Sequence, residues 1–275
     1  MLDIVNTILQ GAKDEFKSNG VNSLSDADFL LAFVLGVPKS QLYTVTNIDN
    51  EKLEIFNSLV SRRILGEPMD SILGSTEYLG LNIPFSKNVL TPRQETEIMV
   101  DNIIREHEGV DGLRVLDLCS GSGCIGLSMS KHLHADVTLA DISQEAMLEA
   151  RKNALINNVQ ATFIISNLFD NITGKFDIII SNPPYIPTKD INSLEREVVE
   201  YDPILALDGG EDGLDFYRRI VKDAPKYLQD GGKIYMEFGI GQGEQIYNLM
   251  SKSFKDIEIF RDYSGIERYI KGIKK

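Results

Sequence analysis

The spacing of apolar residues follows a helical period through the first quarter of the chain. Apolar side chains recur three and four positions apart at Leu2, Val5, Ile8 and Leu9, and again at Phe29, Leu30, Phe33 and Val34. This spacing predicts amphipathic helices, with Asp26 and Asp28 at the acidic start of the second. A further helix is predicted over 50–65, with its apolar side formed by Leu53, Ile55, Phe56 and Leu59. The turn at Gly66 to Pro68 ends it.

Two changes of pattern follow. Residues 75–93 alternate apolar and polar side chains between turn formers, which predicts a β-hairpin, and a helix is expected to begin near Gln94, just after Pro92. From Arg114 onward the pattern repeats strand, loop and helix. Strands are expected at 114–119, 136–141, 162–166, 176–181, 232–238, 256–260 and 268–272, and helices between them include 143–157 and 214–228.

Alternating strands and helices predict an α/β fold with a doubly wound, mostly parallel, seven-stranded sheet. The expected organisation is a small N-terminal helical domain over 1–74, a β-hairpin connector over 75–93 and a catalytic domain over 94–275. Ligands of such sheets bind beyond the carboxyl ends of the strands, so the loops after the strands are the places to look for chemistry.

Charge and composition narrow the class of partner. The formal net charge is −13 and no run of Lys and Arg is present, which argues against direct binding of nucleic acid. No stretch is long and apolar enough for a membrane span, and the N-terminus lacks the pattern of a signal peptide. The cysteines, Cys119 and Cys124, are expected to be reduced thiols in a cytoplasmic protein, and nothing indicates more than a monomer.

The first strand of the α/β region runs into a glycine-rich loop. Its glycines, Gly121, Gly123 and Gly126, match G-x-G-x-x-G, which permits a tight turn and close approach of a ligand to the backbone at a helix N-terminus. The pattern serves dinucleotides as well as S-adenosylmethionine. Asp117, late in the strand, favours the second ligand, because a carboxylate there attracts an amino group and repels a pyrophosphate.

Further cofactor contacts are expected after the next two strands. Asp141 ends the second strand, where a carboxylate can accept hydrogen bonds from both ribose hydroxyls, although Asp141 or Ser143 can instead cap the following helix. Asn167 and Leu168 follow the third strand and can border an adenine ring, and Leu168 can equally belong to the core. The predicted cofactor-binding set is Asp117, Cys119, Ser120, Gly121, Ser122, Gly123, Asp141, Asn167, Leu168 and Asn182.

The fourth strand ends in Asn182-Pro183-Pro184-Tyr185. Two prolines make a rigid loop whose carbonyls can point outward. Asn182 Oδ1 and the Pro183 carbonyl can accept both hydrogens of a substrate NH₂ group, and Tyr185 offers a flat face to a planar amide or base. Two acceptors stabilise the positive charge that grows on the nitrogen and aim it along the S–C axis for direct in-line transfer, without a strong base. Asn182, Pro183 and Tyr185 are the predicted catalytic residues, and Pro184 joins them in holding the substrate.

Several segments together carry a resemblance to a known family. The chain resembles the bacterial release factor glutamine N5-methyltransferases, or HemK family, which are class I, Rossmann-like, S-adenosylmethionine-dependent enzymes. The matching segments are Arg62-Arg63 with 66–68 and 72–74, Thr91 to Glu97, Asp117 to Gly123, Asn182 to Tyr185, and Met236 to Gly239. Three positions depart from the family: Cys119 stands where glycine is frequent, Leu168 where many relatives have tryptophan, and Phe238 where many have histidine.

The resemblance implies methylation of the glutamine in the Gly-Gly-Gln loop of class 1 peptide chain release factors, with S-adenosylhomocysteine as the product. It implies that residues matching Gly121, Asp141 and Asn182 touch the cofactor and that the helical domain helps to hold the release factor. Alternatives are a glutamine methyltransferase for a ribosomal protein, an adenine-N6 methyltransferase for nucleic acid, a nicotinamide-dependent oxidoreductase and a non-catalytic binding module.

Other features are not assigned a role in the reaction. Arg93 can contact the carboxylate region of the cofactor or cap a domain interface, and Glu237 can be purely structural. The run Asp208 to Gly213 lacks the spacing of a calcium loop and is interpreted as a flexible loop on the substrate side. His132 and His134 lack the further ligands that a metal site needs, so no metal is expected.

Overall fold

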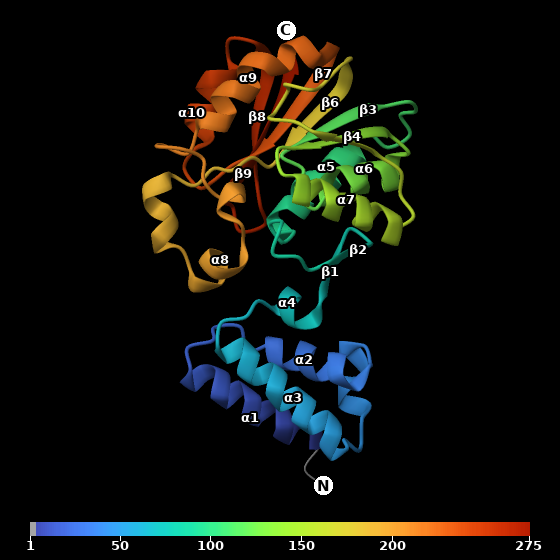
Figure 1. Cartoon of the computed structure of the whole chain (residues 1–275), viewed down its shortest axis with the longest axis vertical. Coiled ribbons are helices and arrows are strands. Elements are labelled where there is room, and N and C mark those ends of the chain that lie inside the picture. Colours follow the sequence, from blue (N-terminus) through green and yellow to red (C-terminus); the bar gives the residue numbers. More distant parts are fainter. Residues whose placement is uncertain (1–3) are drawn as a thin grey trace. The chain divides into compact units, whose positions relative to one another are not determined.

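The computed structural model describes residues 4–275 (Figure 1). Met1 to Asp3, and with them Leu2 of the first predicted helix, lie outside the described residues. Contacts within the chain divide it into two compact units, one ending at Ser75 and one running from Thr76 to Lys275. None of the helices in the described part combines the length and the apolar character that crossing a bilayer requires.

The first unit is helical. It contains α1 (Ile4–Ser18), α2 (Asp26–Leu35), the 3-10 helix η1 (Lys39–Thr44), α3 (Asn50–Ile64) and α4 (Met69–Leu73). Val5 and Leu9 of α1 are buried as expected, and they pack with Leu30 of α2 and Phe56 of α3 in one core.

Two of the apolar faces predicted for this unit are partly wrong. Phe29 and Phe33 of α2 are 46% and 53% exposed, whereas Leu30 is buried as expected, together with Ala27 and Leu31. In α3, Phe56 and Leu59 are buried as expected, whereas Ile55 is exposed. A short helix with apolar residues on most sides does not reveal from its spacing which side meets the core.

The second unit opens with a two-stranded sheet, β1 (Ser75–Tyr78) and β2 (Leu81–Pro84), followed by α5 (Gln94–Glu106). Leu79 and Gly80 between the strands both have positive φ, as a two-residue hairpin turn requires. The remaining helices and strands are β3 (Arg114–Leu118), α6 (Cys124–Leu133), β4 (Asp136–Asp141), α7 (Gln144–Ile156), β5 (Thr162–Ile165), β6 (Phe176–Ser181), η2 (Thr188–Ser193), α8 (Arg196–Tyr201), η3 (Ile204–Ala206), α9 (Asp215–Tyr227), β7 (Leu228–Glu237), α10 (Gly243–Met250), β8 (Phe254–Arg261) and β9 (Glu267–Lys274).

The predicted fold class is confirmed. Seven strands form one sheet in the order β5-β4-β3-β6-β7-β9-β8, parallel except for the two antiparallel pairings that β9 makes. One face packs against α5, α6 and α7, and the other against α9 and α10 (Figure 1). The chain builds outward from β3 to β5 and then returns to the other side of β3 with β6. The loops after β3 and β6 therefore leave neighbouring strands in diverging directions, which is where a crevice forms in doubly wound sheets.

Candidate functional site

A cavity of about 630 Å³ opens at this crevice, within the range of small-molecule sites. The strand ends beside it are tied together, because Ser181 Oγ at the end of β6 donates to the Leu118 carbonyl at the end of β3 at 2.8 Å. Most of the predicted site residues line the cavity, namely Cys119, Ser120, Gly121, Ser122, Asp141, Asn167, Leu168, Asn182 and Pro184.

The loop after β3 depends on unusual backbone conformations. Cys119 has φ +57° and Gly121 has φ +51°, both in the left-handed region that favours glycine. This explains in physical terms why glycine suits the position of Cys119. Gly126 meets a different demand, because a Cβ there would collide with the Leu139 side chain of β4. The third glycine thus lets α6 approach the sheet closely.

Asp141 supports that loop from the neighbouring strand. Its Oδ2 accepts a hydrogen bond from Gly121 N at 2.9 Å, and its Oδ1 accepts one from Ser143 N at 2.9 Å. Ser143, and not Asp141, caps α7, because Ser143 Oγ accepts from Ala146 N at 3.1 Å. Burial raises the pKa of Asp141, and hydrogen bonds from backbone N–H groups oppose that rise. The carboxyl therefore holds the loop and borders the cavity at once.

Asp117 lies beneath the loop and is not among the residues that line the cavity. Its side chain is fully buried, and Oδ2 accepts from Gly126 N in the first turn of α6 at 2.9 Å, while Oδ1 has no partner. Burial raises the pKa of Asp117 to about 8. The predicted contact of Asp117 with an amino group of the cofactor stays a prediction.

The far wall of the cavity comes from the loop after β5 and from α9. Leu168 has φ +54° and borders the cavity while also belonging to the core with Phe169. Asn167 Oδ1 accepts a hydrogen bond from Arg219 Nη2 of α9 at 2.8 Å. Phe216 and Arg219 were not anticipated from the sequence, because a helix distant along the chain supplies them.

The Asn182-Pro183-Pro184-Tyr185 loop stands at the end of β6. Asn182 and Pro184 face the cavity, whereas Pro183 is buried and Tyr185 packs on the core next to Gly239. Burial raises the pKa of Tyr185 to about 12, so the phenol is neutral at physiological pH. A neutral ring fits the expected role of a packing face and not that of a base.

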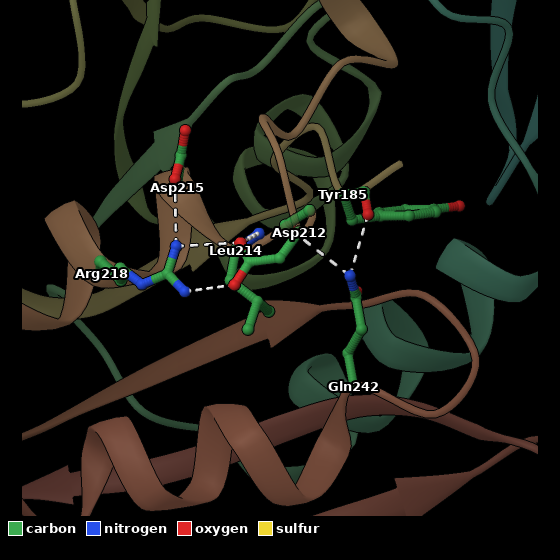
Figure 2. A network of polar contacts seen from close by, with 7 residues as sticks. Tyr185, Asp212, Leu214, Asp215, Arg218 and Gln242 are labelled. Atoms are coloured by element: carbon green, nitrogen blue, oxygen red, sulfur yellow. Dashed lines mark hydrogen bonds and ion pairs between the residues drawn. The ribbon is translucent and has the colours of Figure 1, made fainter. Parts of the chain in front are cut away.

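The side chain of Gln242 fixes the backbone of Tyr185 (Figure 2). Gln242, at the start of α10, donates from Nε2 to the Tyr185 carbonyl at 2.9 Å and to the Gly213 carbonyl at 3.4 Å. Its Oε1 accepts from Gly239 N at 2.9 Å. One side chain thus joins the loop after β6, the loop before α9 and the loop after β7.

Hydrogen bonds and ion pairs connect the run Asp208 to Gly213 with its neighbours. Ile186 N donates to the Leu207 carbonyl at 3.0 Å, and Gly209 N donates to the Ile186 carbonyl at 2.8 Å. Arg218 pairs with Asp212 and with Asp215, which fastens the other end of the run to α9 (Figure 2). The run therefore forms the support behind Tyr185.

A longer segment, 188–206, crosses beside the cavity and contributes Pro203, Leu205 and Ala206 to its lining. Arg93 ties this segment down, because its Nη2 contacts Asp202 Oδ2 at 2.5 Å, and Thr91 N donates to Asp202 Oδ1 at 3.5 Å. Asp202 is buried, and this burial raises its pKa although Arg93 acts in the opposite direction. Of the two roles weighed for Arg93, neither included this contact.

Within residues 4–275, no group of three or more His, Cys, Asp or Glu side chains is arranged to hold a metal ion. His132 is engaged instead with the hairpin, where Nε2 lies 2.9 Å from the Leu79 carbonyl. His134 ends α6 with φ +52°. Both cysteines are free thiols.

Comparison with solved structures agrees with the fold. A methyltransferase from Pyrococcus furiosus matches with a TM-score of 0.51 at 18% identity, over 71% of this chain and 89% of that one. The Thermus thermophilus 16S rRNA N2 G1207 methyltransferase, solved with AdoMet and guanosine, matches with a TM-score of 0.53 at 20% identity, over 73% of this chain and 50% of that one. At these identities the likeness shows the fold alone.

Sequence comparison is more specific. A family model described as the methyltransferase small domain matches residues 85–200, and one described as the PrmC N-terminal domain matches 7–74. The release factor glutamine methyltransferase of Geobacter sulfurreducens is 39% identical over 98% of this chain and 96% of the relative. That of Thermodesulfovibrio yellowstonii is 37% identical over 90% of this chain and 91% of the relative. The chain therefore belongs to the release factor glutamine methyltransferase family.

Proposed function

We propose that this enzyme transfers a methyl group from S-adenosylmethionine to the side-chain N5 of the glutamine in the Gly-Gly-Gln loop of class 1 peptide chain release factors. The observation that carries the proposal is the position of Asn182 on the cavity wall, one strand away from the loop that Asp141 supports. This geometry brings a cofactor cradle and an amide acceptor to one crevice, in a chain whose relatives carry the name of this activity.

The residues around the cavity suit S-adenosylmethionine. Asp141 presents a carboxyl to ribose hydroxyls, and each of its oxygens retains a lone pair beyond the one that a backbone N–H uses. Leu168 and Phe216 form apolar walls for an adenine ring, and Asn167 lies on the cavity wall where it can contact the polar edge of that ring. When bound, the cofactor supplies an electrophilic methyl group on its sulfonium and leaves as S-adenosylhomocysteine.

The residues of the loop after β6 orient the substrate amide for the reaction. Asn182 Oδ1 and the Pro183 carbonyl accept the two hydrogens of the glutamine amide, and Tyr185 packs against its plane. The new N–C bond forms as the S–C bond breaks, and the amide proton goes to solvent. Tyr185 does not take that proton, because its raised pKa belongs to a phenol that is already protonated.

The family and the net charge also indicate the kind of molecule that the enzyme methylates. The family name and the charge of −13 support a protein substrate without direct contact to nucleic acid. The helical unit ending at Ser75 is the proposed contact for the body of the release factor. We propose that the enzyme acts as a monomer in the cytoplasm.

The test offers the enzyme, with labelled S-adenosylmethionine, a class 1 release factor, total ribosomal protein and duplex DNA in parallel. The expected result is label in the release factor, in the peptide that contains Gly-Gly-Gln. Label confined to ribosomal protein or to DNA would contradict the proposed substrate. Replacing the target glutamine of the release factor with alanine should remove the signal.

A further inference from the structure

The amide of Asn182 can face the cavity with either its oxygen or its nitrogen, and only the oxygen can accept a hydrogen from a substrate amide. The structure contains a contact that distinguishes the two orientations. Asn182 Nδ2 donates to Thr96 Oγ1 at 3.3 Å. Thr96 is in the first turn of α5 and only 3% exposed, so water does not compete for its hydroxyl.

Glu237 lies on the other side of the same amide. The parallel pairing of β6 with β7 aligns Ser181 with Met236, which brings the next residues, Asn182 and Glu237, side by side at the strand ends. Glu237 is 5% exposed, and burial raises the pKa of its carboxyl to about 7, while the neighbouring side chains of Thr96 and Asn182 oppose that rise. Its Oε2 has no partner. A buried carboxyl that is only partly satisfied is costly, so the contacts of Glu237 with its neighbours call for an explanation.

These contacts turn the amide nitrogen of Asn182 toward the protein. Nδ2 donates to the Thr96 hydroxyl, and the side chains of Thr96 and Asn182 both favour the charged form of the Glu237 carboxyl, as hydrogen-bond donors do. Reversing the amide would turn Oδ1, in place of an N–H donor, toward the Glu237 carboxyl. That arrangement is repulsive in a buried site, where electrostatic interactions are strong.

We infer that Thr96 and Glu237 are positioning residues that fix the orientation of the Asn182 amide, so that Oδ1 faces the substrate nitrogen. This inference rests on the proposed function, in which Asn182 accepts a hydrogen of the glutamine amide. A reversed Asn182 would present N–H donors to a substrate group that needs acceptors, and the growing charge on the nitrogen would lose part of its stabilisation. Neither residue takes part in bond making.

The direct test compares Thr96→Val, which keeps the shape and removes the hydroxyl, with Thr96→Ser, which keeps the hydroxyl. Thr173→Val, at an exposed position, is the matched control. We expect Thr96→Val to lower kcat about tenfold and to leave the affinity for S-adenosylmethionine, measured by calorimetry, within about twofold. Thr96→Ser should keep most of the activity. Equal kcat for Thr96→Val and wild type would overturn the inference.

A double-mutant cycle separates positioning from a general structural effect. If Thr96 acts through Asn182, then Thr96→Val should have little further effect on kcat in an Asn182→Ala background. Losses that multiply in the double variant would contradict the inference.

Glu237→Met, with exposed Glu244→Met as its control, removes the acceptor and gives independent evidence should Thr96→Val fold poorly. It should lower kcat with unchanged cofactor affinity, and an unaltered kcat would count against the role of Glu237. Wild-type enzyme that leaves the release factor unmethylated would refute the proposed function instead, so the two failures are distinguishable.

Discussion

Gln242 holds the backbone of Tyr185 through a hydrogen bond of 2.9 Å from its Nε2 to the Tyr185 carbonyl (Figure 2). The two residues are far apart in sequence and lie in the loops that follow β6 and β7. Since the Gln242 Oε1 is occupied by Gly239 N, the side-chain amide has only one orientation that satisfies both ends. The backbone from which the Tyr185 ring projects is thereby held in place.

Gln242→Met should weaken substrate positioning while leaving the cofactor site intact. Methionine has a similar length but cannot donate to the Tyr185 carbonyl or accept from Gly239 N. We expect kcat/KM for the release factor to fall roughly tenfold, from the loss of hydrogen bonds worth about 1 kcal/mol each. Steady-state kinetics at saturating S-adenosylmethionine measure this. The control, Gln245→Met, changes an exposed position of the same helix and should behave as wild type.

Gly209→Ala tests the close contact between the supporting loop and Tyr185. A Cβ on Gly209 would lie 2.8 Å from Tyr185 Cα and 2.9 Å from the Gly213 carbonyl oxygen, and both neighbours are backbone atoms. We expect a loss of about 1–3 kcal/mol in the free energy of unfolding, measured with urea, and reduced turnover. Gly11→Ala, in helix α1 with open space around it, should instead stabilise by about 0.5–1 kcal/mol. Similar effects of both variants would contradict the packing argument.

How far the sequence predicts this molecule depends on the range of the interactions involved. The strands and the helices around them follow from local periodicity, and Ser143 as a cap follows from local hydrogen bonding. The faces of α2 and the position of Asp117 beneath its loop depend on which neighbours pack there. The links from Gln242 to Tyr185 and from Thr96 to Asn182 join residues 57 and 86 positions apart. No spacing rule in one sequence identifies such pairs.

Arg93→Met should loosen the segment 188–206. It leaves the buried carboxyl of Asp202 without its cationic partner, at a cost of about 1–3 kcal/mol for a charged hydrogen bond. The segment carries an exposed Arg196, so limited trypsin digestion should cut there faster than in wild type. Arg105→Met, which removes an exposed ion pair with Asp101, is the control and should leave the rate unchanged.

Neutralising Asp202 supplies the complementary check. Asp202→Asn in the Arg93→Met background removes the uncompensated charge and should restore part of the protection. Digestion that is equally fast in the single and the double variant would show that the charge of Asp202 does not open the segment.

Asp117 makes the stability of the enzyme depend on pH. Burial raises the pKa of Asp117 to about 8, above its ordinary value of 3.8. The folded state therefore holds a proton that the unfolded state releases between these values, and stability is lost as the pH rises through that window. Asp117→Asn removes this contribution. Urea unfolding without cofactor should show that the free energy of unfolding of the variant, relative to that of wild type, is higher at pH 8 than at pH 5. The same difference at both pH values would exclude the raised pKa.

The most direct test of the account is mass spectrometry of tryptic peptides from a class 1 release factor incubated with S-adenosylmethionine and either wild-type enzyme or Asn182→Ala. Wild type should add the mass of one methyl group to the glutamine of the Gly-Gly-Gln peptide. Asn182→Ala should bind S-adenosylmethionine with nearly wild-type affinity yet methylate at least ~100-fold more slowly. An unmodified peptide with wild type, or undiminished methylation by Asn182→Ala, would contradict it.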